Sequence, residues 1–499
     1  MRILVHPFYS SRIVDSAPTY NMDADLIGKM LRKHDDLYFY VVYPMLGKLG
    51  EGRACTYKAR RNRFAQMDRV TVVEVPMAQV QQREIMLFPE RLWELFNDSD
   101  GLHSVDLVWT EHPQAAPLIA KALRVTNSLR GPEIPVIASS QLRQTQRFNH
   151  DAGEDDDLLF ALACLTSYPT FYSPHQRDGF LDDLRAYLTP AMQKRFLERA
   201  TVIPTSLDCD YVDSVREDEL QSHGKYDKIT LTWSHKLYNL SHKRKCFEWM
   251  DSVYRSGRDV GLQIVSGSDQ AMVELKIPKE FRHFQIFGGS TRERFLRLSS
   301  RAHIFLSNNA WEDCSLTINE QMYCGLLPVV PDREWARYQA PDDWPFFYRN
   351  AKEAQSILRH FVDEYEQVAG EWIPKLREHV RRKFGAATVS ETLYELFRRV
   401  LAEAKERRLA GMPQVDKSTY EFLPKSMVEL LEREVLMALG DRFTESELWA
   451  QITKKSSGWQ MVRDQGMQDK SKLDLIRAVK RRGYRDLLDG PEIVFQRET

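Results

Sequence analysis

The stretch HIFLSNNAWEDCSLTINEQMYCGLLPVVP, residues 303–331, decides the fold of this chain. It predicts a short apolar strand, a polar loop, a helix that ends at Gly325, and a second apolar strand. Two buried-type strands joined by a helix are typical of a βαβ unit, in which the strands lie parallel in one sheet. We therefore expect an α/β protein.

The same alternation of apolar runs and helical stretches extends through most of the chain. The first group of expected strands is RILVHPF, LYFYVVYP, VTVVEVP and VDLVWTE, and the second is KITLTWS, GLQIVSG, FQIFGG, HIFLSN and LLPVVPD. The polar stretch VREDELQSHGKYDK, residues 215–228, separates the groups and is the expected linker. Two doubly wound domains facing a cleft are predicted, with ligands at the carboxyl ends of the strands.

Composition narrows the class of protein. The chain has 499 residues, 43% of them hydrophobic, which is enough for more than one core. Its 70 Lys and Arg balance 71 Asp and Glu, so any basic surface must be local. Neither a secretory leader nor a membrane span is expected, which predicts a cytoplasmic protein. The six scattered cysteines predict buried thiols rather than a zinc site.

Two glutamates in the opening stretch are the first candidates for chemistry. Glu312 is expected in the loop after the first strand, and Glu320 about one turn inside the helix. A helix N-terminus attracts phosphate, and a carboxylate near it can accept hydrogen bonds from ribose hydroxyls. The alternative is that Glu312 caps the helix and Glu320 lies on the surface.

The surroundings of these glutamates favour the ligand site. The segment 292–332 resembles the signature region of family 4 retaining glycosyltransferases of GT-B architecture: an amphipathic helix, a strand, Glu-x7-Glu, and glycine before PVV. FLERATVIPTSLDCDYVDS and KLREHVRRKFGAATVSETLYELFRRVL resemble the two crossovers between the domains of that family. The resemblance covers about residues 1–409, and its most specific part follows residue 200.

The resemblance implies roles for individual residues. Glu320 matches the glutamate that holds the donor ribose, and Glu312 the one beside the transferred sugar. The backbone around Cys314, Ser315 and Leu316 would face the sugar and diphosphate, although DCS stands where the family has glycine-rich sequence.

Basic residues are expected on the leaving diphosphate. After the strand ending at Trp233, Lys243 opens a helix, and Lys236 or His235 occupies the first basic position of the family. The alternative is solvated surface charge. His112 resembles the family's histidine that contacts the donor sugar, and its alternative is a structural role.

The implied reaction is transfer of a sugar from a nucleotide-diphosphate sugar, with UDP-glucose as the working donor, to a hydroxyl group with retention of configuration. The departing phosphate would take the acceptor proton. No DxD-like pair follows a strand, so we expect neither a metal nor a cofactor.

The expected domain boundaries follow the same resemblance. Residues 1–205 form the acceptor-side Rossmann-like domain, 206–386 the nucleotide-sugar domain, 387–411 a closing helix that crosses back, and 412–499 a small, mainly helical module. In that module, helical segments before the strand EIVFQR are compatible with a winged-helix-like domain, and a plain helical appendage also fits.

The sequence leaves three hypotheses open: two kinds of acceptor, and a function without sugar transfer. Lys480, Arg481 and Arg482 lie in KSKLDLIRAVKRRGYR, where basic residues flank an apolar stripe and could reach DNA phosphates. Together with the appended module, they favour a hydroxymethylated pyrimidine in phage DNA. The alternatives are a polysaccharide or lipid-linked acceptor, and a nucleic-acid-binding protein on a decayed transferase fold.

Overall fold

The protein is represented by a computed structural model. It describes residues 1–7, 22–44, 61–75, 78–80, 84–86, 105–111, 116, 119, 134–140, 161, 163–185, 188–234, 240–267, 273–274, 277–309, 314–409, 439, 442–444, 447, 450–451, 484–489 and 492–497. The chain divides into two compact units, Met1–Arg143 with Leu162–Glu406, and Gln144–Ala161 with Arg407–Thr499.

The first unit contains two parallel sheets, of which the N-terminal one has seven described strands in the order β3-β2-β1-β6-β7-β8-β9. These strands are β1 (Arg2–His6), β2 (Tyr38–Pro44), β3 (Val70–Val75), β6 (Leu107–Thr110), β7 (Val136–Ser140), β8 (Tyr168–Phe171) and β9 (Thr201–Val202). The order of the strands reverses between β1 and β6, which pair in parallel. The carboxyl ends of these two strands therefore form a switch point, where open α/β sheets bind ligands.

Helices and a small hairpin accompany this sheet. They are α1 (Met22–Lys33), α6 (Pro174–Leu184), α7 (Pro190–Arg199), and the hairpin of β4 (Ala78–Val80) and β5 (Glu84–Met86). Prolines at the starts of α6 and α7 fit the first helical turn, where no N–H is needed, and Ser173 and Thr189 cap those helices. Tyr172 lies between the end of β8 and the cap residue of α6, at the carboxyl edge of the sheet.

The second parallel sheet has the described order β12-β11-β10-β13-β14-β15. Its strands are β10 (Ile229–Ser234), β11 (Val260–Val265), β12 (Gln285–Phe287), β13 (Ile304–Leu306), β14 (Leu327–Pro331) and β15 (Phe347–Tyr348). The order reverses between β10 and β13. The expected strand–loop–helix–strand stretch runs from β13 to β14 and begins at this second switch point.

The second sheet is surrounded by helices that share one large core with it. They are α8 (Cys209–His223), α9 (Leu240–Arg255), a 3-10 turn (Lys279–Phe281), α11 (Arg292–Arg301), α12 (Leu316–Cys324), α13 (Glu334–Gln339), α14 (Ala351–Asp363) and α15 (Tyr365–Phe384). The linker prediction for 215–228 was wrong, because α8 occupies most of it. Val212, Val215 and Glu219 recur at helical spacing and are buried, so this stretch packs despite its charge.

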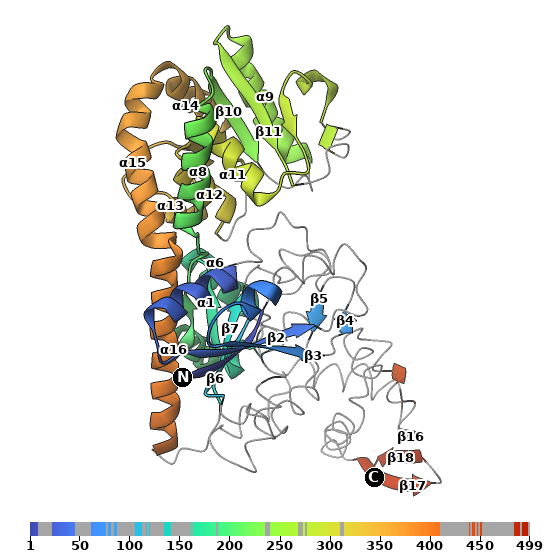
Figure 1. The fold of residues 1–499 in the computed structure, drawn as a ribbon. Coiled ribbons are helices and arrows are strands. Elements are labelled where there is room, and N and C mark those ends of the chain that lie inside the picture. Colours follow the sequence, from blue (N-terminus) through green and yellow to red (C-terminus); the bar gives the residue numbers. More distant parts are fainter. Residues whose placement is uncertain are drawn as a thin grey trace. The chain divides into compact units, whose positions relative to one another are not determined.

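Helix α16 (Ala386–Leu409) joins the two halves of the first unit. Val389, Leu393, Phe397 and neighbouring residues lie in the same core cluster as Ile3 and Val5 of β1. Figure 1 shows α15 and α16 following one another along the molecule, with α16 beside the N-terminal sheet. The chain thus returns to its first sheet, as the resemblance in the sequence implies.

The second unit contains an antiparallel sheet of three described strands, β16 (Arg442–Thr444), β17 (Tyr484–Asp489) and β18 (Glu492–Arg497), in the order β16-β18-β17. The predicted strand EIVFQR is β18, and it forms a hairpin with β17. The predicted helix before β17 lies outside the described residues. In the part of the chain that the structure describes, no helix has the length and apolar character needed to cross a membrane.

Candidate nucleotide-sugar site

The second switch point is fixed by contacts between α12 and the sheet. Ser234, the last residue of β10, is buried and accepts a hydrogen bond from Gln321 Nε2 at 3.1 Å. The helix ends at Gly325, whose φ of 90° lies in the left-handed region that glycine adopts without strain. Helix α12 is therefore held with its N-terminus near the carboxyl edge of the sheet, where β13 ends.

Glu320 is the expected site residue that the structure describes most fully. Its side chain is 1% exposed, so the alternative of a surface glutamate is wrong. Arg292 Nε donates to Glu320 Oε1 at 2.9 Å, while Oε2 is buried and has no hydrogen-bond partner among the described residues. Burial raises the pKa of this carboxyl group, and the Arg292 charge opposes that rise. The structure thus leaves one buried carboxylate oxygen available to a hydrogen-bond donor.

Arg292 was missed by sequence reasoning. It is the first residue of α11, directly after the cap residue Thr291, and its side chain is only 14% exposed. Its guanidinium lies 5.4 Å from the ring centroid of Tyr211 on α8, a cation–π contact. The first turn of a helix favours acidic residues, so an arginine there is a weak sequence signal for a specific role.

The N-terminus of α12 is held by Gln339, another residue that the sequence did not single out. Gln339 Oε1 accepts from the Ser315 backbone N–H at 3.0 Å, and its Nε2 donates to Ser315 O and to Asn319 Oδ1, each at 2.8 Å. The Ser315 N–H is therefore engaged within the protein. The first N–H groups inside the helix have no carbonyl partner within it and remain suited to a phosphate.

The two neighbours of Ser315 are buried. Cys314 Sγ lies 3.1 Å from Thr205 Oγ1 in the segment that joins the two sheets, and Leu316 is part of the core. If these residues face the donor, they do so through backbone atoms. Their predicted contact with sugar and diphosphate stays a prediction.

Several expected site residues lie outside the described residues. These are Glu312, His112, His235, Lys236, Lys480, Arg481 and Arg482. Lys243 lies in the first turns of α9, but its side chain is not described. Of the predicted constellation, the structure brings Glu320, Cys314, Ser315 and Leu316 to one helix start. Among the described residues, no group of His, Cys, Asp and Glu could hold a metal ion.

The first switch point carries different side chains. His6 at the end of β1 lies with Nδ1 3.1 Å from Thr110 Oγ1 at the end of β6, and the next residue, Glu111, is buried. Burial raises the pKa of Tyr172, and the charges of Glu111, Cys314 and Asp23 raise it further, so these groups lie near its ring. The carboxyl edge of the N-terminal sheet is therefore polar and acidic.

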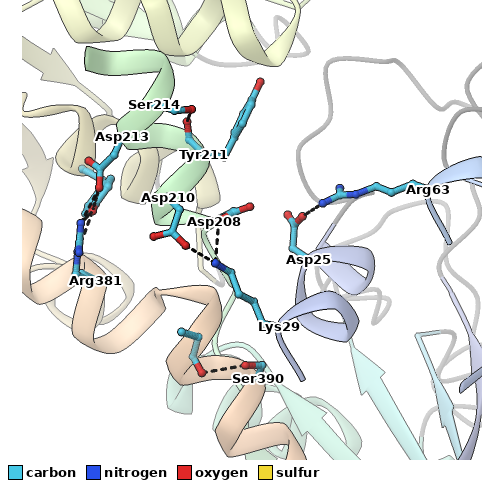
Figure 2. A network of polar contacts seen from close by, with 12 residues as sticks. Asp25, Lys29, Arg63, Asp208, Asp210, Tyr211, Asp213, Ser214, Arg381 and Ser390 are labelled. Carbon is cyan, nitrogen blue, oxygen red and sulfur yellow. Dashed lines mark hydrogen bonds and ion pairs between the residues drawn. The ribbon is translucent and has the colours of Figure 1, made fainter. Parts of the chain in front are cut away.

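Ion pairs connect the first helix of the N-terminal half to α8 of the other half. Lys29 on α1 pairs with Asp208 at 3.6 Å and also with Asp210 (Figure 2). On the same helix, Asp25 pairs with Arg63; burial raises the pKa of Asp25, and the charges of Arg63 and Arg292 oppose that rise. Arg292 therefore acts electrostatically on both Glu320 and the N-terminal helix.

Comparisons with known proteins agree with this architecture. No family model matches the chain, and no curated protein matches it in sequence. Among solved structures, HepE of Anabaena in complex with UDP-glucose has a TM-score of 0.54 at 13% identity, covering 79% of this chain and 98% of its own.

Two further solved structures are similar to this chain in fold at low sequence identity. A glycosyltransferase from Rickettsia africae has a TM-score of 0.56 at 11% identity, covering 80% of this chain and 98% of its own. Sucrose-phosphate synthase from Thermosynechococcus elongatus has a TM-score of 0.53 at 13% identity, covering 81% of this chain and 99% of its own. The chain has the GT-B fold, and the prediction of two parallel α/β sheets with added C-terminal elements is confirmed.

Proposed function

We propose that the protein is a retaining glycosyltransferase that takes its sugar from a nucleoside-diphosphate sugar. The observation that carries the proposal is the buried Glu320 carboxylate, with one oxygen bonded to Arg292 and the other without a partner among the described residues. It lies one turn from a helix N-terminus beside the β10/β13 switch point, where phosphate and ribose bind in related sheets. The HepE complex with UDP-glucose makes a UDP-sugar the first donor to test.

In this proposal, the protein orients both substrates and neutralises the leaving group. The bond from the sugar's anomeric carbon to the diphosphate breaks, a bond to the acceptor oxygen forms on the same face, and a diphosphate oxygen takes the acceptor proton. Glu320 would hold the ribose, the α12 N-terminus and Lys243 would stabilise the diphosphate, and Glu312 and His112 would lie beside the sugar. We expect activity to persist in a chelator, and loss that added magnesium restores would contradict this.

The test of this function starts with calorimetry of the full chain against UDP, GDP, ADP and TDP. We expect one diphosphate to bind, and Glu320→Ala to weaken its binding by about tenfold or more, because a ribose hydroxyl loses its charged acceptor. Glu219→Ala is a matched control, since Glu219 is also a mostly buried glutamate but pairs with Arg297 and His223 on α11 and α8. Absence of binding to all four diphosphates, or equal affinity in Glu320→Ala, would refute the donor site.

We further propose a hydroxymethylated pyrimidine in DNA as the acceptor. The supporting observation is the strand order β16-β18-β17, in which the first strand lies beside the last, as in the small sheet of winged-helix domains. The basic segment containing Lys480, Arg481 and Arg482 leads directly into β17. Such a module would supply the sequence-independent phosphate contacts of DNA binding.

The acceptor can be tested in the full chain with K480A/R481A/R482A. We expect weaker binding to duplex DNA and a salt dependence about two to three units shallower in slope, because three phosphate contacts are lost. K454A/K455A is the control, because it removes two lysines from another segment of residues 412–499. Mass spectrometry of nucleosides after incubation with UDP-glucose and hydroxymethylated DNA would reveal the product.

Other outcomes assign the alternatives. Unchanged DNA binding together with transfer to a polysaccharide or lipid-linked sugar would replace the DNA acceptor. DNA binding without transfer or hydrolysis of any nucleotide sugar would identify a nucleic-acid-binding protein on a decayed transferase fold.

A further inference from the structure

Arg292 occupies an unusual position for a charged side chain. It is largely buried, lies against the ring of Tyr211, and donates through Nε to Oε1 of Glu320 at 2.9 Å. Its partner carboxylate is more deeply buried still, and Oε2 of that carboxylate has no described partner. A buried ion pair with one unsatisfied oxygen is costly for a fold unless another group completes it.

We propose that Arg292 is a positioning residue of the donor site: it occupies Oε1 of Glu320 and so fixes Oε2 as the acceptor for a ribose hydroxyl. The inference rests on the proposed function, because Arg292 acts on the ligand through Glu320. The contact is formed across 28 residues of sequence, between the first turn of α11 and the middle of α12. The ribose then completes the hydrogen bonding of a carboxylate that the described residues leave half satisfied.

The geometry requires an arginine rather than any cation. A guanidinium is planar, so it can lie against the Tyr211 ring while its Nε donates in a fixed direction to Glu320. A lysine could supply the charge but would lack both the fork and the stacking. We therefore expect Arg292→Lys to bind nucleotide with an affinity between those of the wild type and Arg292→Gln.

The charge of Arg292 also determines how the site responds to pH. Burial raises the pKa of Glu320, and the Arg292 charge opposes the rise. Among the described residues, Tyr211 and Cys324 also interact with Glu320, and Asp25 interacts with Arg292. Removing Arg292 leaves burial unopposed, so Glu320 takes up a proton at higher pH. Nucleotide affinity should then begin to fall at a higher pH in Arg292→Gln than in the wild type.

The experiment is calorimetry of the full chain with UDP, or with the diphosphate that binds best, between pH 5.5 and 8 as suggested working limits around neutrality. We expect Arg292→Gln to weaken binding about tenfold near pH 7.5, equivalent to about 1.4 kcal/mol, and to lose further affinity on acidification. Arg294→Gln is the matched control: it removes the same charge from the same helical turn, but Arg294 is exposed and lies over Phe287. Its affinity should stay within about twofold of the wild type.

A double-variant comparison separates positioning from folding. Because Arg292 acts through Glu320, R292Q should cost little further affinity once E320Q is present. The double variant R292Q/E320Q removes both buried charges together, so it keeps the test available if Arg292→Gln alone does not fold. Equal affinities for E320Q and R292Q/E320Q support the inference.

Either of two results with the variants would overturn the inference. If R292Q folds and matches the wild type in affinity and pH profile, or if R292Q weakens binding equally in the E320Q background, Arg292 does not act through Glu320. If the wild type binds no nucleoside diphosphate, the proposed function fails first and the inference fails with it.

Discussion

The two parallel sheets offer different chemistry at the same topological position. At the β10/β13 switch point, the buried pair Arg292–Glu320 brings a cation close to the helix start that is suited to phosphate. At the β1/β6 switch point, His6 and Thr110 contact each other beside buried Glu111, and burial raises the pKa of Tyr172, with a further rise from the charges of Glu111, Cys314 and Asp23. A diphosphate would be repelled by the second edge, whereas a neutral hydroxyl could donate to it.

Under the proposed function, the difference would let two copies of one fold bind the two substrates of a transfer reaction. Both sheets reverse their strand order and so gather loops at one edge, but side chains decide which ligand each edge accepts. The proposed assignment of donor to the C-terminal sheet and acceptor to the N-terminal sheet is therefore supported by charge as well as by resemblance. A variant at one sheet should change the binding or turnover of one substrate and leave the binding of the other unchanged.

The largest effect is expected for Lys243→Ala, on the donor side. Turnover should fall by about a hundredfold to a thousandfold, because a fixed positive charge is removed from the departing diphosphate. The control is Arg244→Ala, the adjacent residue, which pairs with Glu248 and Glu280 on the surface. Steady-state kinetics and melting temperature are measured for both; normal turnover with a lowered melting temperature would make Lys243 structural.

A second prediction concerns acid and distinguishes the two sheets by stability. His303 is buried before β13, its Nδ1 accepts the Thr230 N–H at 3.0 Å, and burial lowers its pKa to about 4. Because the unfolded chain binds this proton near pH 6.5, stability should fall as pH drops from 6.5 toward 4, by up to about 3 kcal/mol. Hydrogen exchange should show β10 and β13 opening before β1 and β6.

The matched variants for this prediction are His303→Asn and His283→Asn. The first removes the titrating ring but keeps a possible acceptor, so acid sensitivity should decrease. The second removes a more exposed histidine that pairs with Asp251, and the dependence of stability on pH should remain. If the stability of His303→Asn fell with acid as steeply as that of the wild type, groups other than His303 would cause the loss.

Sequence reasoning identified the parts of the fold that depend on local pattern. Apolar runs gave β1, β2, β3, β6 and the first five strands of the second sheet, and the Glu-x7-Glu spacing located Glu320 in α12. Strands β7, β8 and β9 were missed because VIASS ends in serines, YPTF contains a proline, and TV is only two residues long.

The residues that support the site could not be inferred from spacing. Arg292 meets Glu320 only because α11 and α12 pack together, and Gln339 reaches Ser315 across 24 residues. Both contacts are products of tertiary packing, for which a single sequence carries no periodic signal. The charged surface of α8 likewise concealed the buried side that makes it a helix rather than a linker.

The smallest effect is expected on the acceptor side, for Glu111→Gln. Glutamine keeps the shape and one acceptor oxygen, so only the charge of the hydrogen bond to an acceptor hydroxyl is lost, about 1 kcal/mol or five- to tenfold in the KM for acceptor. Asp106→Asn is the control, because Asp106 lies just before β6, at the opposite edge of the sheet, where it accepts from the Arg2 N–H. Donor affinity should change by less than about twofold in both variants, since neither carboxylate has a role in the proposed donor site. A rise in the acceptor KM for Glu111→Gln alone would support the division between the two edges. If Glu111→Gln instead weakened UDP binding and left the acceptor KM unchanged, the acidic edge would belong to the donor, and the division of the reaction between the sheets would have to be reversed.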